Sequence, residues 1–128
     1  MSEAPKLPKA LLVEDDPDVH NLLFDQLREA HLDVTGVYTV HEALRLIDDG
    51  YRPAVAVIDQ SLPDGDGAEV CRRLKQLPEG SEIACLLRSE AANLEKLARE
   101  AGADAWLAKT SDLATLRQHV MALLKRDR

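Results

Sequence analysis

The sequence predicts an α/β fold, a doubly wound five-stranded parallel sheet with helices on both faces. Residues 54–58 form an apolar run without alternation, bounded by turn residues, which is typical of a strand buried on both faces. Four further short apolar runs alternate with segments of helical periodicity. No repeat or long linker interrupts this alternation, and parallel strands require such helical crossovers. At 128 residues, the chain is expected to form one domain.

The strands are expected at residues 10–13, 34–38, 54–59, 83–87 and 105–108. The first helix is expected to begin at Asp16, because Asp is a good N-cap and the proline after it is favoured in the first turn. The second helix is predicted by a capping box formed by Thr39 and Glu42. A third helix is expected over residues 68–77. Ser89 is expected to cap the fourth helix, and residue 110 or 111 the fifth, which covers residues 113–124.

Composition limits the classes of function. The chain is 45% hydrophobic and 30% charged, with a net charge of −7. This charge disfavours nucleic acids and anionic membranes as direct ligands. No run is long enough to span a membrane. Both cysteines lie in apolar segments without a C-x-x-C motif, as expected of reduced thiols in the cytoplasm. The four histidines lack metal-ligand spacing and are expected to be solvated or to cap helices. Residues 1–9 are expected to be an N-terminal extension.

Acidic residues follow two of the expected strands. Glu14 and Asp15 come directly after the first strand, and Asp59 ends the third. The strand order 2-1-3-4-5 is the natural candidate for five strands, and it places the first and third side by side at the edge where ligands bind. Carboxylates brought so close require compensation, for which Mg²⁺ is suited. Lys109 ends the fifth strand at the same edge. Together these groups suggest phosphoryl transfer onto a carboxylate.

Three segments then indicate a family. Residues 12–16 (LVEDD), 59–67 (DQSLPDGDG) and 102–109 (GADAWLAK) occur in the order and at the spacing of response regulator receiver domains, which the chain resembles from residue 10 to 124. The resemblance implies a flavodoxin-like, chemotaxis-receiver-like fold. It implies that Asp59 is the phospho-acceptor and that Lys109 contacts the phosphoryl group. It further implies that Glu14, Asp15, Asp59 and the backbone carbonyl of Ser61 hold Mg²⁺.

The expected function follows from this resemblance. Residues 10–125 would be the receiver domain of a bacterial two-component system or phosphorelay. A histidine kinase or phosphotransfer protein would donate the phosphoryl group, and the change would switch a surface read by a downstream protein. That surface would lie on the fourth helix, fifth strand and fifth helix, with Lys96, Arg99, Trp106 and Arg117. The chain would not be an enzyme beyond assisting its own phosphorylation and dephosphorylation. Its oligomeric state is left open.

The switch positions depart from the family pattern. The position of the family's Ser or Thr hydroxyl is Leu87, and the small residue that normally follows is Arg88. We expect Arg88 either to fold over the carboxylates or to lie in solvent. The family's Lys-Pro is Lys109–Thr110, and a cis bond without proline costs roughly 3 kcal/mol, so a trans bond is expected. Trp106 takes the place of the switch aromatic and is expected to pack between the last two helices or to respond to phosphorylation.

These departures motivate an alternative, a pseudo-receiver that binds a protein partner without phosphorylation. An aspartyl-nucleophile phosphatase is disfavoured, because Ser61 stands where such enzymes carry a second acid. A flavin or nucleotide binder is disfavoured because the loop after the first strand is acidic, whereas phosphate-binding loops are rich in Gly, Ser and Thr.

Overall fold

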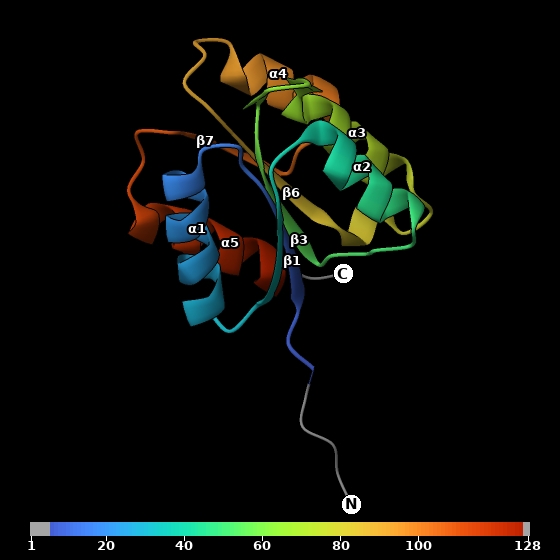
Figure 1. Cartoon of the computed structure of the whole chain (residues 1–128), viewed down its shortest axis with the longest axis horizontal. Helices are drawn as coiled ribbons and strands as arrows, with labels where there is room; N and C mark the ends of the chain where they lie inside the picture. The colour runs from blue at the N-terminus through green and yellow to red at the C-terminus, as the bar shows by residue number, and fades with distance from the viewer. Residues whose placement is uncertain (1–5, 127–128) are drawn as a thin grey trace, which may run out of the picture.

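The computed structural model describes residues 6–126 and has a central sheet of five parallel strands (Figure 1). The strands are β1 (Lys9–Val13), β2 (Asp33–Val37), β3 (Val55–Asp59), β6 (Ala84–Ser89) and β7 (Ala105–Ala108). Their order is β2-β1-β3-β6-β7, which confirms the predicted 2-1-3-4-5 arrangement. The edge at the carboxyl ends of β1 and β3 therefore collects the acidic residues that follow these strands.

Helices cover both faces of the sheet. Figure 1 shows α1 (Pro17–Glu29) and α5 (Leu113–Lys125) on one face, and α2 (Val40–Asp48), α3 (Gly67–Gln76) and α4 (Leu94–Ala101) on the other. Alternate residues of the strands point to opposite faces, so each face has its own apolar cluster. Leu11, Ile58 and Leu87 belong to the cluster beneath α2, α3 and α4. Leu12, Val57 and Leu86 belong to the cluster beneath α1 and α5.

The caps of the first two helices are as predicted. The Asp16 carboxylate accepts hydrogen bonds from two backbone N–H groups of the first turn of α1, with Pro17 at the first helical position. The Thr39 hydroxyl accepts the N–H of Glu42, and the Glu42 carboxylate accepts the N–H of Tyr38. This last bond draws Tyr38 into the helix cap, which explains why β2 ends one residue earlier than expected.

Two other caps were predicted wrongly. Helix α5 is capped by Asp112, whose carboxylate accepts the N–H of Thr115 at 2.7 Å, while residues 110 and 111 belong to the preceding turn. The Ser89 hydroxyl accepts the N–H of Ala91, and α4 begins only at Leu94. Strand β6 extends to Ser89 because its last two residues pair with β7.

The segment after β3 folds into a small hairpin that the sequence did not predict. Strands β4 (Ser61–Leu62) and β5 (Gly65–Asp66) pair antiparallel, and the Asp64 carboxylate at their turn accepts the first two N–H groups of α2, at 2.8 and 2.9 Å. At Gly67 a Cβ atom would lie 2.0 Å from the carbonyl oxygen of Asp59. The hairpin and α3 can therefore start this close to β3 only with glycine there.

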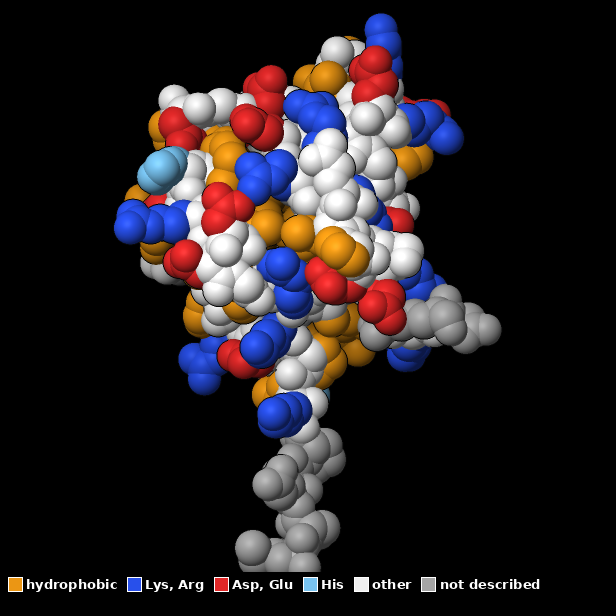
Figure 2. Space-filling model, turned by 90° about the vertical axis from the view of Figure 1, so that its right-hand side faces the viewer, with side chains coloured by type: hydrophobic (Ala, Val, Ile, Leu, Met, Phe, Trp, Pro, Cys, Tyr) orange, Lys and Arg blue, Asp and Glu red, His pale blue; other side chains and the backbone are white. Residues whose placement is uncertain are grey.

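The remaining features concern the ends and the surface of the molecule. Residues 1–5 of the expected extension lie outside the described residues, and Lys9 already belongs to β1. Among residues 6–126, none of the helices combines the length and apolar composition that crossing a membrane would require. On the face seen in Figure 2, basic side chains are interspersed with acidic ones and do not form a patch of one sign.

Candidate functional site

Three carboxylates meet at the carboxyl edge of the sheet. Glu14 and Asp15 follow β1, and Asp59 is the last residue of β3, its neighbour in the sheet. One oxygen of each lies within 4.8 Å of the others. Glu14 and Asp59 are buried, with 2% and 1% of their surface exposed, whereas Asp15 is exposed. The strand order thus brings together the three acids that the sequence placed at this edge.

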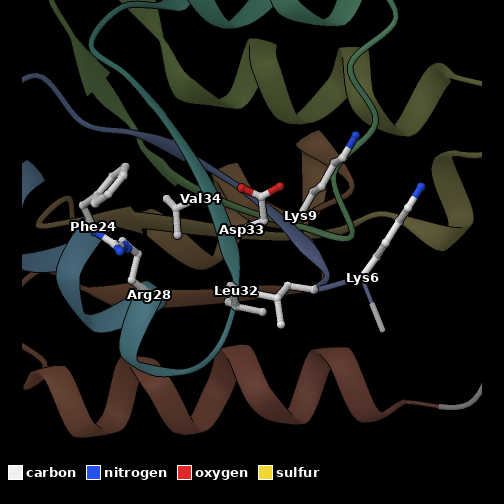
Figure 3. A pocket seen from close by; sticks show the side chains of 8 residues that line it. Lys6, Lys9, Phe24, Arg28, Leu32, Asp33 and Val34 are labelled. Atoms are coloured by element: carbon white, nitrogen blue, oxygen red, sulfur yellow. The ribbon is translucent and has the colours of Figure 1, made fainter. Parts of the chain in front are cut away.

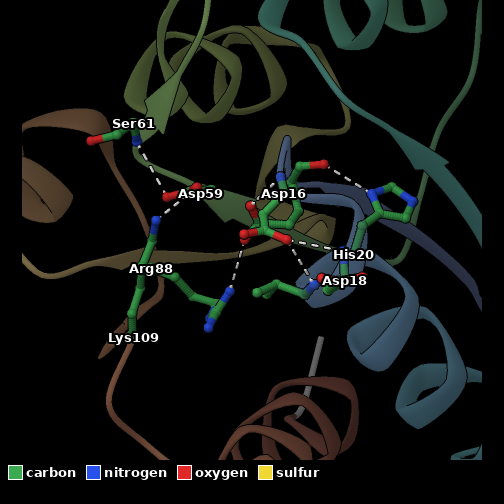
Figure 4. Close-up of polar contacts among 9 residues, drawn as sticks. Asp16, Asp18, His20, Asp59, Ser61, Arg88 and Lys109 are labelled. Carbon is green, nitrogen blue, oxygen red and sulfur yellow. Dashed lines mark hydrogen bonds and ion pairs between the residues drawn. The ribbon is translucent and has the colours of Figure 1, made fainter.

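Backbone N–H groups and one ammonium fix the buried carboxylates (Figure 4). The Asp16 N–H donates to Glu14 Oε2 at 3.0 Å, and the Ser61 N–H donates to Asp59 Oδ1 at 3.3 Å. Lys109 Nζ lies 2.9 Å from Asp59 Oδ2 and thus forms an ion pair with it. Both oxygens of Asp59 therefore have a donor, which keeps its carboxylate oriented toward the pocket.

A second cation enters the pocket from β6. The Arg88 side chain is nearly buried, and its Nη1 donates to Glu14 Oε1 at 3.2 Å. Of the two conformations expected for Arg88, the structure has the one folded over the carboxylates. With all five groups ionised, the two cations leave one negative charge uncompensated among the three acids.

The pKa of Glu14 reflects this environment. Burial raises the pKa of the Glu14 carboxyl above its usual value, and the charge of Asp59 adds to this increase. The N–H of Asp16 and the positive charges of Lys109 and Arg88 act in the opposite direction without cancelling it. The negative charge of Glu14 is therefore stabilised by its N–H donor and its two cationic neighbours against the effect of burial.

His20 was missed by sequence reasoning. Its side chain is buried, and ring Nδ1 lies 2.9 Å from the Glu14 carbonyl oxygen. The ring stacks on Tyr38, with 4.1 Å between the centroids. The expectation that the histidines are solvated or cap helices is therefore wrong for His20. Its spacing of three and seven residues from Leu23 and Leu27 places it on the buried face of α1, which is the signal that could have identified it.

The switch positions are arranged without a hydroxyl facing the acids. Leu87 is fully buried in the cluster beneath α2, α3 and α4. Trp106 packs against the same cluster, and the Arg99 guanidinium lies 5.1 Å from its ring centroid. The expectation that Trp106 packs between the last two helices is thus wrong, because strand alternation turns its side chain to the face covered by α4. All described peptide bonds are trans, Lys109–Thr110 included.

The donor set suits a hard divalent cation. Mg²⁺ prefers carboxylate oxygens, keeps several waters and shares its remaining positions with phosphate oxygens. Three carboxylate oxygens within 4.8 Å of one another offer such a site, and Asp15 keeps it open to solvent. Because Lys109 and Arg88 already pair with two of these carboxylates, a metal ion would share the pocket with resident cations.

A separate pocket lies far from this edge. It is formed where β1 and β2 begin, beside the later part of α1 (Figure 3), and its lining includes Lys9, Phe24, Arg28 and Asp33. The acids lie at the opposite, carboxyl ends of these strands. The acidic cluster and this pocket are therefore separate sites at opposite ends of the strands.

Comparisons with known proteins agree with this fold. The chain matches the response regulator receiver domain family over residues 10–121. The transcriptional regulatory protein PrrA of Mycobacterium tuberculosis is 35% identical over 120 residues, which are 93% of this chain and 51% of PrrA. The response regulator protein PilR of Pseudomonas aeruginosa is 31% identical over 118 residues, which are 91% of this chain and 26% of PilR. The chain thus spans about half or less of these curated relatives.

Solved structures give the same result. A CheY-like response regulator receiver domain protein from Methanospirillum hungatei superposes with a TM-score of 0.83 at 26% identity, covering 93% of this chain and 94% of that one. The signal receiver domain of a histidine kinase from Syntrophus aciditrophicus has a TM-score of 0.82 at 29% identity, covering 94% and 95%. The fold, the strand order and the family match together show that this chain belongs to the response regulator receiver domains.

Proposed function

We propose that this chain is a phospho-accepting receiver domain of a two-component system or phosphorelay, and that Asp59 is the residue phosphorylated. One observation carries the proposal. Asp59 is buried at the carboxyl end of β3, Lys109 and the Ser61 N–H hold its two oxygens, and two further acids lie beside it. The Asp59 carboxylate is held in a fixed orientation, has the Lys109 ammonium beside it, and is reached from solvent on the side of the exposed Asp15. These are the requirements of an oriented nucleophile.

The chemistry is a transfer between two carriers. A histidine kinase or phosphotransfer protein presents a phosphohistidine, and a carboxylate oxygen of Asp59 forms a bond to phosphorus as the phosphorus–nitrogen bond breaks. The ring nitrogen of the histidine keeps the electron pair of the broken bond and takes up a proton from water, and the product is an acyl phosphate on Asp59. Lys109, whose side chain is 29% exposed, neutralises charge on the transferred group from the position it already holds beside Asp59.

A divalent cation completes the proposed site. Glu14, Asp15, Asp59 and the backbone carbonyl of Ser61 would hold Mg²⁺, which would supply Lewis-acid stabilisation of the phosphoryl oxygens. In this proposal the chain works in the cytoplasm, which keeps its two buried thiols reduced, and it catalyses no reaction other than its own phosphorylation and dephosphorylation.

The output in this proposal is a surface that a downstream protein reads. Trp106 and Arg99 form a stacked pair between β7 and α4, so a change at the end of β7, where Lys109 follows, reaches an exposed face through this pair. Lys96 lies on α4, the same helix as Arg99. Arg117 lies on α5, on the other face of the sheet, where it lines a hollow with Ala30 and His31 and is not next to this pair. We infer that phosphorylation alters the face of the molecule formed by α4, β7 and α5.

A pseudo-receiver is the second candidate, and two observations favour it. Leu87 provides no hydroxyl for a phosphoryl oxygen, and Arg88 pairs with an acid of the metal site. In that case the same α4–β7–α5 face would bind its partner in the unmodified protein.

Intact-mass measurement separates the two candidates. The purified chain is incubated with Mg²⁺ and acetyl phosphate, quenched in acid and weighed, with Asp59→Asn as the matched variant. The receiver proposal predicts a gain of one phosphoryl group that requires Mg²⁺ and is absent in the variant. An unchanged parent mass at saturating Mg²⁺ and donor would support the pseudo-receiver instead.

A further inference from the structure

Arg88 occupies a position that links the two halves of the site. It is paired in register with Asp59 across β3 and β6, and in-register neighbours on parallel strands point to the same face. Its side chain therefore enters the pocket that contains the buried acids. There its Nη1 meets Glu14 Oε1 at 3.2 Å, while only 9% of the side chain remains exposed.

The ion pair between Arg88 and Glu14 occupies a carboxylate that a metal ion would need as a ligand. Glu14 Oε2 accepts the Asp16 N–H and Oε1 accepts Arg88 Nη1, so each oxygen of Glu14 already has one donor. A guanidinium keeps its charge at every pH of interest. It therefore cannot make room for a second cation by losing a proton, as a histidine could. Two cations at one buried oxygen repel each other, and the low polarity of the surroundings strengthens the repulsion.

We propose that Arg88 is an internal counter-ion that competes with the divalent cation for Glu14. Metal binding and release of Arg88 from Glu14 are then one coupled event. In the metal-free protein, the Arg88 guanidinium neutralises the buried Glu14 carboxylate in place of the metal ion. The inference deepens the proposed function, because it rests on Glu14, Asp15 and Asp59 being the metal site, and it concerns how that site is regulated.

Two consequences distinguish a competitor from a passive structural residue. Removing the charge of Arg88 tightens Mg²⁺ binding, because nothing has to be displaced. The same change lowers the thermal stability of the metal-free protein, because a buried carboxylate loses its partner, and added Mg²⁺ restores that stability. A residue that merely positioned Glu14 would weaken metal binding when removed.

The test is calorimetric titration with MgCl₂ alone, without any phosphoryl donor, together with melting curves in EDTA and in Mg²⁺. Arg88→Met keeps the length of the stem and removes the charge, and Arg88→Lys keeps the charge. Arg73→Met is the control for net charge, because Arg73 pairs with Asp48 on the surface. We expect Arg88→Met to bind Mg²⁺ on the order of tenfold more tightly than the parent, which corresponds to about 1.4 kcal/mol. Arg88→Lys and Arg73→Met stay within about threefold of the parent.

Equal or weaker Mg²⁺ affinity in Arg88→Met overturns the competition. If neither the parent nor Arg88→Met binds Mg²⁺, both this inference and the metal site of the proposed function are overturned. If Arg88→Met binds Mg²⁺ more tightly than the parent as expected, yet the parent gains no phosphoryl group in the mass assay, only the proposal that Asp59 is the phospho-acceptor is overturned.

A second measurement uses the unaltered protein, in case Arg88→Met does not fold. The guanidinium protons of Arg88, followed by ¹⁵N–¹H NMR, exchange slowly with water in EDTA because the group is buried and paired. They exchange faster once Mg²⁺ saturates the protein. Exchange that stays the same on saturation contradicts the displacement.

Discussion

Asp104 ties three elements together at the end of the sheet opposite to the acidic site. Its carboxylate accepts the N–H of Cys85 in β6 at 2.8 Å, pairs with Lys75 of α3 at 2.7 Å and pairs with Arg126 after α5 at 2.7 Å. Lys75 and Asp104 are only about one-fifth exposed, whereas Arg126 is more accessible. We predict that replacing Asp104 destabilises the fold more than any exposed carboxylate would.

The magnitude follows from these contacts. A hydrogen bond to a charged group contributes about 1.5–3 kcal/mol, and an exposed ion pair about 0–1 kcal/mol. Asp104→Ala loses the partly buried pair with Lys75 and leaves the Cys85 N–H without its acceptor, so we expect a loss of about 2–4 kcal/mol. Asp104→Asn keeps an acceptor for that N–H and should lose about half as much.

The pH dependence gives the sharper test. Burial alone would raise the pKa of Asp104, but the Lys75 ammonium, the Cys85 N–H and the Arg126 guanidinium together hold it below its usual value. An unfolded Asp titrates near pH 3.9. The stabilisation is therefore fully present above that value and is lost as the pH falls through the lower pKa of the folded state.

The assay is urea unfolding of the parent and Asp104→Asn between pH 3 and 8, in EDTA. The difference in free energy of unfolding should be constant from about pH 5 to 8 and should shrink below about pH 4, because the protonated carboxyl resembles the amide. Asp48→Asn, at an exposed pair with Arg73, should change stability by no more than about 0.5 kcal/mol. A difference between parent and Asp104→Asn that is equally large at pH 3 and pH 7 would refute the reasoning.

Three further predictions concern other contacts. Gly67→Ala should cost about 1–3 kcal/mol in urea unfolding, because its Cβ would meet the Asp59 carbonyl oxygen, and an unchanged midpoint would contradict this. Asp64→Ala should speed amide hydrogen exchange at the first two residues of α2, whose N–H groups lose their acceptor, and leave α5 unaffected. The thiols of Cys71 and Cys85 should react with a thiol reagent only as fast as the protein opens, because both are buried. Rapid reaction in the native state would be the opposite result.

Local sequence patterns predicted most of the fold. Strand existence and order followed from uninterrupted apolar runs and from the crossovers that parallel strands need, and the meeting of Glu14, Asp15 and Asp59 followed from that order. The caps at Asp16 and Thr39 were predictable because each bonds only to residues within its own first turn. These features depend on neighbours in the sequence or on the topology, both of which the sequence specifies.

The features that were missed depend on contacts between distant segments. The Asp64 carboxylate caps α2 from a hairpin 23 or 24 residues further along the chain, and no local pattern marks it. The direction of Arg88 could not be decided from sequence, because a long side chain at the end of a strand reaches either solvent or the pocket. The cap of α5 was misassigned because residues 110, 111 and 112 are all good capping types, and only the turn geometry selects Asp112.

The central claim is that Asp59 itself receives the phosphoryl group, and chemical trapping tests it most directly. The chain is treated with Mg²⁺ and acetyl phosphate and then with borohydride, which reduces an acyl phosphate to an alcohol. The peptides that contain residues 14–15 and residues 54–72, together with the rest of the digest, are sequenced by mass spectrometry. The account predicts homoserine in place of Asp59, dependent on Mg²⁺, with Glu14 and Asp15 unaltered. Reduction at another carboxylate, or at none while the Mg²⁺ titration shows binding, would contradict it.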